Sequence, residues 1–173
     1  TRYMASAAGR PHQQILRVDD EVIEPIDDET KTSVIMACER AMEGADAVIL
    51  SDHGKGLLHE SVIWNIIRMA TPRSIPVLVD PARNIDSWKR YEGSTVIKAN
   101  RHEAEAAGFG WLACISRPGG PAVDIRALSS NDRWPAETIV ITLDADGFLM
   151  ATAEYDTHHE APNVHGVSDV VGA

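Results

Sequence analysis

Residues 45–80 read ADAVILSDHGKGLLHESVIWNIIRMATPRSIPVLVD, and this stretch decides the fold class. The apolar run Ala45–Leu50 is short enough for a strand and leads into the polar turn Ser51–Gly56. Apolar residues at helical spacing follow in His59–Thr71, a proline-containing break ends that helix, and Val77–Val79 is a second buried strand. Strand, turn, helix and strand make a βαβ unit, so the sequence predicts an α/β fold with a mostly parallel sheet.

The same alternation continues on both sides of this unit. Residues 27–44 are predicted to be a helix, because the acidic Asp27 and Asp28 suit its first turn and a glycine ends it. The other predicted elements are, in chain order, the extended segment Thr1–Glu21, the strand Thr95–Lys98, the helix Arg101–Ala107 and the strands Thr138–Thr142 and Gly147–Thr152.

The composition fits about one globular domain and excludes several classes of protein. With 44% hydrophobic and 24% charged residues in 173, the chain is neither disordered nor collagen-like, and no apolar run approaches the roughly 18 residues of a membrane-spanning helix. The formal net charge of −10 argues against nucleic-acid binding, which needs clustered lysine and arginine. Cys38 and Cys114 show no disulfide or CxxC spacing, so we expect a cytoplasmic protein. The first residue is Thr rather than Met, and we expect the chain to begin inside a longer protein.

Polar clusters follow four of the predicted strands. They are Ser51–Gly56, Asp80–Arg83, Asn100–Glu103 and Thr142–Gly147. In open parallel sheets a ligand binds at the carboxyl ends of the strands. We therefore expect these clusters to converge on one edge of the sheet and to form the binding site there.

The cluster at residues 100–103 allows two interpretations. A carboxylate such as Glu103 on the first turn of a helix can organise Mg²⁺ through water and so orient phosphates. Alternatively, Asn100 caps the helix and Glu103 is its partner in a capping box. Spacing alone favours the capping box.

Two further clusters also allow two interpretations each. Lys55, in a turn with two glycines, suits a phosphate or a sugar hydroxyl, but the turn is also an ordinary glycine-rich βα loop. Residues 142–147 either form a hairpin with an Asp-Gly turn, which the pattern favours, or border an adenine and a ribose. The C-terminal histidines His158, His159 and His165 match no zinc motif.

Five segments, taken in this order, resemble the ribokinase or phosphofructokinase-B family of sugar kinases, and within it the heptose 7-phosphate kinases. They are HQQILRVDDE (12–21), LSDHGKGLL (50–58), VLVDPARNIDSWKRYEGSTVIKANRHEAEA (77–106), VITLDADGFLM (140–150) and VSDVVGA (167–173). They span almost the whole chain, and residues 114–134 do not align.

The resemblance implies a three-layer αβα fold with a small β lid. Residues 1–173 would be a partial kinase domain, with lid-return and entry strands in 1–25, the nucleotide-binding core in 26–173, and the N-terminal part and most of the lid absent. The implied reaction transfers phosphate from ATP to a sugar phosphate, converting heptose 7-phosphate to heptose 1,7-bisphosphate in the synthesis of ADP-heptose and lipopolysaccharide precursors. The implied partner is this small molecule, with no nucleic acid and no membrane, and the parent protein is expected to be a homodimer.

The resemblance also implies roles for individual residues. The family uses an Asn-x-x-Glu motif around Mg²⁺ and the ATP phosphates, and a Gly-Ala-Gly-Asp motif as anion hole and general base. Gly172 and Ala173 begin the second motif, so its aspartate lies beyond the chain end and we expect these 173 residues to be inactive alone. The other matched residues are Asn100, Arg101, His102 and Glu103 for ATP, with Glu103 also holding Mg²⁺ through water; Thr142, Asp144 and Gly147 for the nucleotide; Asp52 and Lys55 for the substrate; and Asp169 for a monovalent cation such as K⁺.

Departures from the family pattern leave the substrate open. His53 stands where heptose kinases usually have tyrosine, and Ala82 and Arg83 stand where they have Lys-Gly. One alternative is another sugar kinase of the family, acting on fructose, ribose or a related compound. The other is a non-catalytic nucleotide-binding module, in which Asn100 and Glu103 only cap a helix.

Overall fold

The computed structural model describes residues 1–5, 13–21, 23–83, 85–109, 135–152 and 154–161. The chain divides into two compact units, one built on Thr1–Ile23 and one on Glu24–Pro162. The larger unit carries all but two of the described strands and all the described helices.

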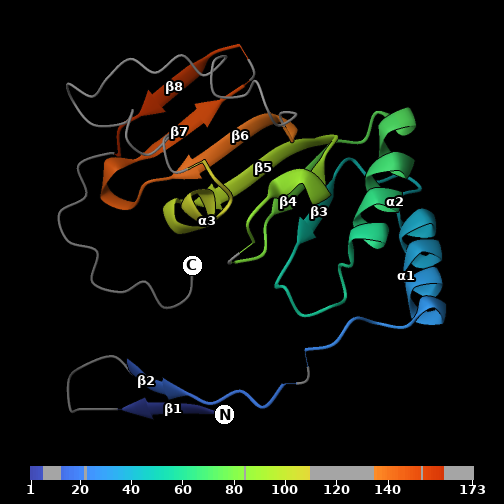
Figure 1. Ribbon diagram of the computed structural model, residues 1–173, viewed down its shortest axis with the longest axis horizontal. Coiled ribbons are helices and arrows are strands. Elements are labelled where there is room, and N and C mark those ends of the chain that lie inside the picture. The colour runs from blue at the N-terminus through green and yellow to red at the C-terminus, as the bar shows by residue number, and fades with distance from the viewer. Residues whose placement is uncertain (6–12, 22, 84, 110–134, 153, 162–173) are drawn as a thin grey trace. The chain divides into compact units, whose positions relative to one another are not determined.

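A six-stranded sheet forms the centre of the larger unit (Figure 1). Its strand order is β3-β4-β5-β6-β7-β8, with β3 to β6 parallel and the last two strands antiparallel to their neighbours. The strands are β3 Val48–Ser51, β4 Val77–Asp80, β5 Ser94–Asn100, β6 Ala136–Thr142, β7 Phe148–Ala151 and β8 Asp156–His159. The predicted α/β class is confirmed, and the four predicted strands lie in one mostly parallel sheet.

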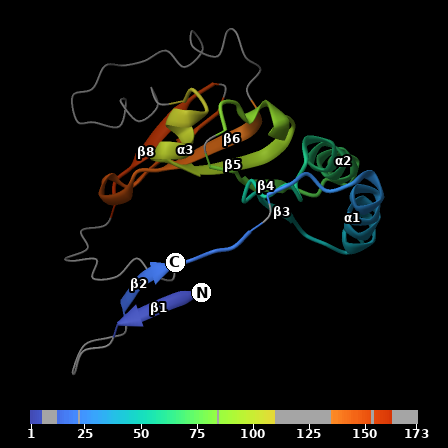
Figure 2. The same cartoon turned by 60° about the horizontal axis from the view of Figure 1, so that its bottom comes forward.

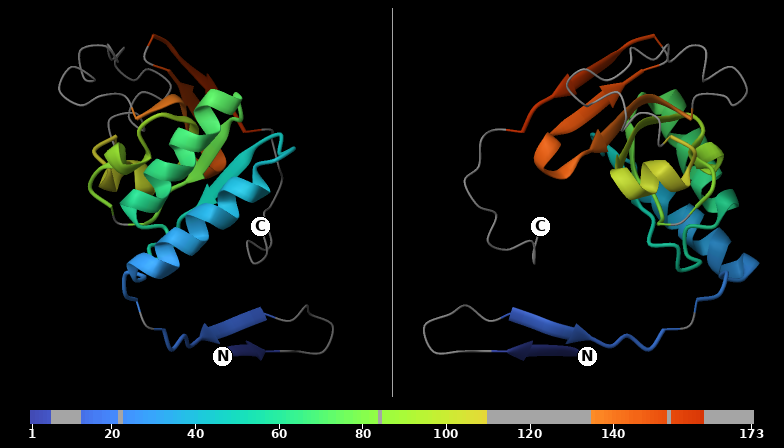
Figure 3. Two further views of the ribbon diagram at one scale, coloured as in Figure 1. Left: turned by 90° about the vertical axis from the view of Figure 1, so that its right-hand side faces the viewer. Right: turned by 60° about the vertical axis from the view of Figure 1, so that its left-hand side comes forward.

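Two long helices follow the predicted pattern. The first, α1 (Asp28–Ala41), begins at Asp27, whose Oδ1 accepts a hydrogen bond from the Thr30 amide at 2.7 Å. The second, α2 (Glu60–Ala70), begins at His59, and the two helices lie side by side (Figure 3). The short α3 (Arg101–Ala106) contacts β5 and β6 (Figure 2). Three 3-10 turns complete the described helical elements: η1 Thr71–Arg73, η2 Trp88–Tyr91 and η3 Asp144–Asp146.

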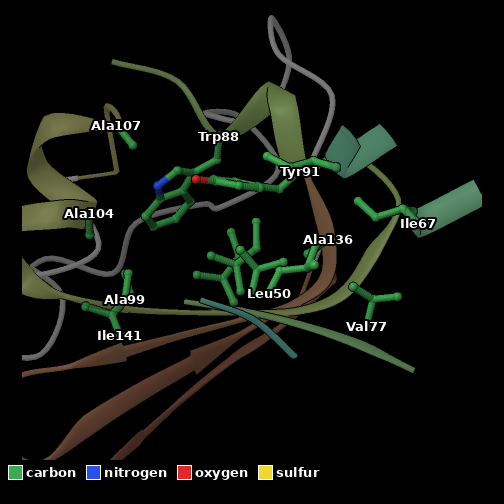
Figure 4. Packing of buried hydrophobic residues seen from close by; sticks show 14 of the residues in the cluster. Leu50, Ile67, Val77, Trp88, Tyr91, Ala99, Ala104, Ala107, Ala136 and Ile141 are labelled. Atoms are coloured by element: carbon green, nitrogen blue, oxygen red, sulfur yellow. The ribbon is translucent and has the colours of Figure 1, made fainter. Parts of the chain in front are cut away.

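The core lies between the sheet and the elements that cover it. Apolar residues predicted to share one face of α2 are all buried: Val62, Ile63, Ile66, Ile67 and Ala70. Figure 4 shows the rings of Trp88 and Tyr91, from η2, packed over the strand residues Leu50 and Val77. Helix α1 contributes less, because its apolar face is only partly buried against this cluster. The core therefore holds α2 and η2 against the sheet.

The sequence missed two elements of this unit. Strand β8 has the sequence DTHH, which carries no apolar alternation, and it pairs at the outer edge of the sheet with β7. The turn η2 has the sequence WKRY, and its two aromatic residues are buried although the segment is polar on both sides. Neither element has a local pattern from which it could have been predicted.

The smaller unit contains a two-stranded antiparallel sheet of β1 (Arg2–Ala5) and β2 (Gln13–Arg17). The amino group of Thr1 donates to the carbonyl of Val18 at 2.6 Å and closes the ladder. The expectation that the first 21 residues are extended is confirmed for the two strands, whereas residues 18–21 form no strand. In the described part of the chain, no helix is both long enough and apolar enough to cross a membrane.

Candidate functional site

The polar clusters that follow the strands lie at one edge of the sheet, as predicted. In the parallel register Ser51 is opposite Asp80, and Asn100 is opposite Thr142. Each of these residues is the last of its strand. The side chains that follow them therefore share the carboxyl edge, where ligands of open parallel sheets bind.

The capping box predicted for α3 is present. Oδ1 of Asn100 accepts a hydrogen bond from the Glu103 amide at 2.9 Å, and Oε2 of Glu103 accepts one from the Asn100 amide at 2.9 Å. Glu103 is buried, with 9% of its surface exposed. This geometry uses only one of its two carboxylate oxygens, so capping does not exclude a second role.

Glu103 also lines a small polar cavity. Arg83, Asn100, His102 and Glu103 line this cavity, which has a volume of about 200 Å³. Oε1 of Glu103 lies 3.8 Å from Nε of Arg83, whose side chain is 84% exposed. The cavity therefore combines one buried carboxylate with an exposed guanidinium and an imidazole, a set that can meet a phosphate together with its cation.

The donor set also limits how a metal ion could bind. Among the residues that the structure describes, no three His, Cys, Asp or Glu side chains are grouped closely enough to hold a metal ion. Mg²⁺ keeps several of its waters and binds through one or two carboxylates and substrate phosphates. A single carboxylate such as Glu103 at the cavity fits that mode of binding, in which most ligands come from water and from the nucleotide.

Arg101 connects the start of α3 with the turn between β6 and β7. Its guanidinium donates to Oδ2 of Asp146 at 3.0 Å. The turn itself is a hairpin, as the pattern favoured, with Asp144 at a φ of 54° and Gly147 at a φ of 91°. A Cβ at Gly147 would collide with the backbone of His159, so this position requires glycine. The nucleotide roles expected for Thr142, Asp144 and Gly147 stay predictions.

Asp52 is buried and both of its oxygens have protein partners. Oδ1 accepts from the Gly54 amide at 2.9 Å, and Oδ2 accepts from the Tyr91 hydroxyl at 2.8 Å. The guanidinium of Arg90 lies 3.6 Å from Oδ2. Lys55, in the same turn, is exposed. A substrate role for Asp52 and Lys55 stays a prediction, and the structure shows that Asp52 also shapes the turn.

Tyr91 is the residue of this site that sequence reasoning missed. Its ring is fully buried, and its hydroxyl accepts a hydrogen bond from the Ala82 amide at 3.1 Å besides donating to Asp52. Burial raises the pKa of Tyr91 far above its usual value, so the hydroxyl keeps its proton. No local signal marks this residue, because its partner Asp52 is 39 residues away in the chain.

The anion hole and the monovalent-cation site fall outside the described residues. Asp169, Gly172 and Ala173 all belong to the stretch 162–173, which is not described. Their roles stay predictions.

Curated relatives match this chain over nearly its whole length, although no protein-family model matches it. The bifunctional protein HldE of Hyphomonas neptunium is 30% identical over 180 residues, which cover 98% of this chain and 36% of the relative. HldE of Trichlorobacter lovleyi is 33% identical and HldE of Pelobacter propionicus is 42% identical, each over 94% of this chain and 32% of its own length. The chain thus spans about a third of the length of the curated relatives it matches.

Solved structures of similar fold match most of this chain. Sa239 superposes with a TM-score of 0.55 at 17% identity, over 97% of this chain and half of its own. Phosphofructokinase-2 from Escherichia coli, in complex with fructose-6-phosphate, superposes with a TM-score of 0.52 at 16% identity, over 91% of this chain and 49% of its own. These structures support the fold alone, and the HldE relatives match the sequence. The chain belongs to the family of the HldE proteins and has the ribokinase-like fold.

Proposed function

We propose that the protein carrying this chain is a sugar kinase, which transfers the γ-phosphoryl group of ATP to a hydroxyl of a sugar phosphate. Heptose 7-phosphate is the proposed substrate and heptose 1,7-bisphosphate the product, in the synthesis of ADP-heptose and lipopolysaccharide precursors. The observation that carries the proposal is Glu103, which caps α3 with Oε2, has Oε1 3.8 Å from Nε of Arg83, and lines a polar cavity with that residue. The similarity to HldE proteins supports the choice of substrate.

We propose that MgATP binds at the capped start of α3. Glu103 would hold Mg²⁺ through water, and the ion would neutralise charge on the transferred phosphoryl group. Arg83 and His102, at the same cavity, are placed to meet phosphate oxygens. Arg101 fixes the turn 142–147 through Asp146, so the turn can border the adenosine. These roles require positioning and charge, which is most of what phosphoryl transfer demands.

The acceptor side needs residues beyond those described. A sugar hydroxyl is a weak nucleophile and needs a general base within hydrogen-bond reach. From the family resemblance we propose that this base follows Gly172 and Ala173, which would form the anion hole, and that Lys55 would meet the sugar phosphate. We therefore propose that turnover requires the longer protein and that these 173 residues alone transfer no phosphate. The protein is further proposed to act in the cytoplasm, as a homodimer, with K⁺ near Asp169.

Release of ADP by the full-length protein tests the proposal. MgATP is supplied with heptose 7-phosphate, fructose 6-phosphate, ribose or no sugar. The proposal expects ADP release that depends on the sugar and is fastest with heptose 7-phosphate. Faster turnover of fructose 6-phosphate or ribose would change the substrate and keep the kinase, whereas binding of ATP with no turnover of any sugar would favour a nucleotide-binding module.

A further inference from the structure

Tyr91 joins the loops that follow two neighbouring parallel strands. Its hydroxyl donates to Oδ2 of Asp52, in the turn after β3, at 2.8 Å. The hydroxyl oxygen of Tyr91 also accepts a hydrogen bond from the amide of Ala82, in the loop after β4, at 3.1 Å. Asp52 continues the connection, because its Oδ1 accepts from the Gly54 amide at 2.9 Å. One buried hydroxyl therefore links the backbones of both loops.

The Tyr91 hydroxyl and both carboxylate oxygens of Asp52 have hydrogen-bond partners, which leave the hydroxyl one orientation. Burial raises the pKa of Tyr91, so its proton stays available to Asp52. Arg90 lies 3.6 Å from the carboxylate and donates to the carbonyl of Leu58 at 2.6 Å, which places a positive charge beside the buried negative one. Such a network is rigid, because each member would lose a buried hydrogen bond if it moved.

Each linked loop carries an exposed cation next to its anchored residue. Lys55 follows Gly54, whose amide is held by Asp52. Arg83 follows Ala82, whose amide is held by Tyr91, and its guanidinium reaches the cavity of Glu103. Fixing the backbone beside a flexible cation lowers the entropy that ligand binding must remove.

We propose that Tyr91 and Asp52 act as one positioning pair, which holds the loops of Lys55 and Arg83 in place before the sugar phosphate binds. This inference rests on the proposed kinase function. Neither member of the pair has to touch the substrate. The pair acts through the two loops, so its loss weakens use of the sugar phosphate more than it weakens the fold.

The test is a double-mutant cycle in the full-length protein. Tyr91→Phe keeps the buried ring and removes the hydroxyl, and Asp52→Asn keeps the shape and removes the charge. We expect kcat/KM for the sugar phosphate to fall at least about tenfold in each single variant. The double variant should have a kcat/KM no lower than that of the less active single variant. Ile63→Val is the control, because it perturbs a fully buried residue of α2 that belongs to neither loop, and it should change kcat/KM less than twofold.

Amide hydrogen exchange tests the positioning role of Tyr91 and Asp52 without relying on the reaction. In Tyr91→Phe the amides of Ala82 and Gly54 should exchange faster, while those of β4 and β5 keep their protection. Unchanged exchange at both amides, or kcat/KM within twofold of the wild type, overturns the positioning role. Losses that add in the double variant also overturn it and make Asp52 a direct ligand. If Tyr91→Phe does not fold, Asp52→Asn is judged by the same two readouts. A wild-type protein without sugar-dependent ADP release rejects the proposed function instead, and exchange still decides the role of the pair.

Discussion

Asn100 and Glu103 hold each other through two reciprocal hydrogen bonds, each 2.9 Å long, at the first turn of α3. This arrangement fixes the carboxylate of Glu103 at the carboxyl edge of the sheet and leaves its other oxygen, Oε1, 3.8 Å from Nε of Arg83, which lines the same small cavity. The capping interpretation and the magnesium interpretation of this motif are therefore compatible. The cap is what would hold the carboxylate in position for the ion.

Gly147 should tolerate no side chain. Its φ of 91° disfavours other residues, and an added Cβ would collide with the backbone of His159. Gly147→Ala should lower the free energy of unfolding by more than about 2 kcal/mol. Gly44→Ala is the control, because Gly44 also has a positive φ but its Cβ would meet nothing within 4 Å, and it should cost only about 1 kcal/mol. Urea denaturation compares the two variants, and equal losses would contradict the collision.

Loss of the ion pair between Arg101 and Asp146 should raise the KM for ATP clearly and lower the free energy of unfolding only slightly. Both side chains are partly exposed, so the pair should contribute only about 0.5 kcal/mol to folding. Arg101→Ala frees the turn 142–147 from α3, and we expect the KM for ATP in the full-length protein to rise about fivefold.

Arg73→Ala serves as the matched control for that variant. It breaks another exposed ion pair, with Glu39, that has no place in the proposed site. Steady-state kinetics with varied ATP should show no change in KM for this control. An equal rise in both variants would mean that the Arg101 pair has no specific role in nucleotide binding.

Asp27 should make the stability of the protein depend on pH in the acid range. Hydrogen bonding from the backbone amide of Thr30 lowers the pKa of Asp27 in the folded state. A lowered folded pKa stabilises the protein above the unfolded value of about 4, and this contribution is lost as the pH falls through the folded pKa. Asp27→Asn keeps a capping oxygen but does not titrate, so the melting temperature of the wild type should exceed that of the variant at pH 7 and converge with it near pH 2.

Asp46→Asn is the matched control for the acid titration. Asp46 is exposed and lies in the connection between α1 and β3, outside any helix. The melting temperature of the Asp46→Asn variant should follow that of the wild type between pH 7 and pH 4. A difference between Asp27→Asn and the wild type that stays constant down to pH 2 would contradict the lowered pKa.

Periodicity explains why most of the fold could be predicted. Helix α2 was predicted because its five buried residues repeat at helical spacing, and β4 was predicted as a short apolar run before a polar turn. Strand β8 was not, because its polar sequence shows no alternation and its pairing with β7 is a contact that the local sequence does not reveal. Within the site, the motif at residues 100–103 could be read locally because its hydrogen bonds span three residues. Tyr91 could not, because its bond to Asp52 exists only after two loops meet.

The most direct test of the account is kcat of the Glu103→Gln variant in the full-length protein, measured by ADP release at saturating MgATP and heptose 7-phosphate. Glutamine can still accept from the Asn100 amide, so the melting temperature should change little, while loss of the charge should lower kcat at least about a hundredfold. Glu29→Gln, in the first turn of α1 and outside the proposed site, should leave kcat unchanged. A Glu103→Gln protein that melts at a lower temperature but keeps kcat within twofold of the wild type would contradict the account and leave Glu103 as a helix cap only.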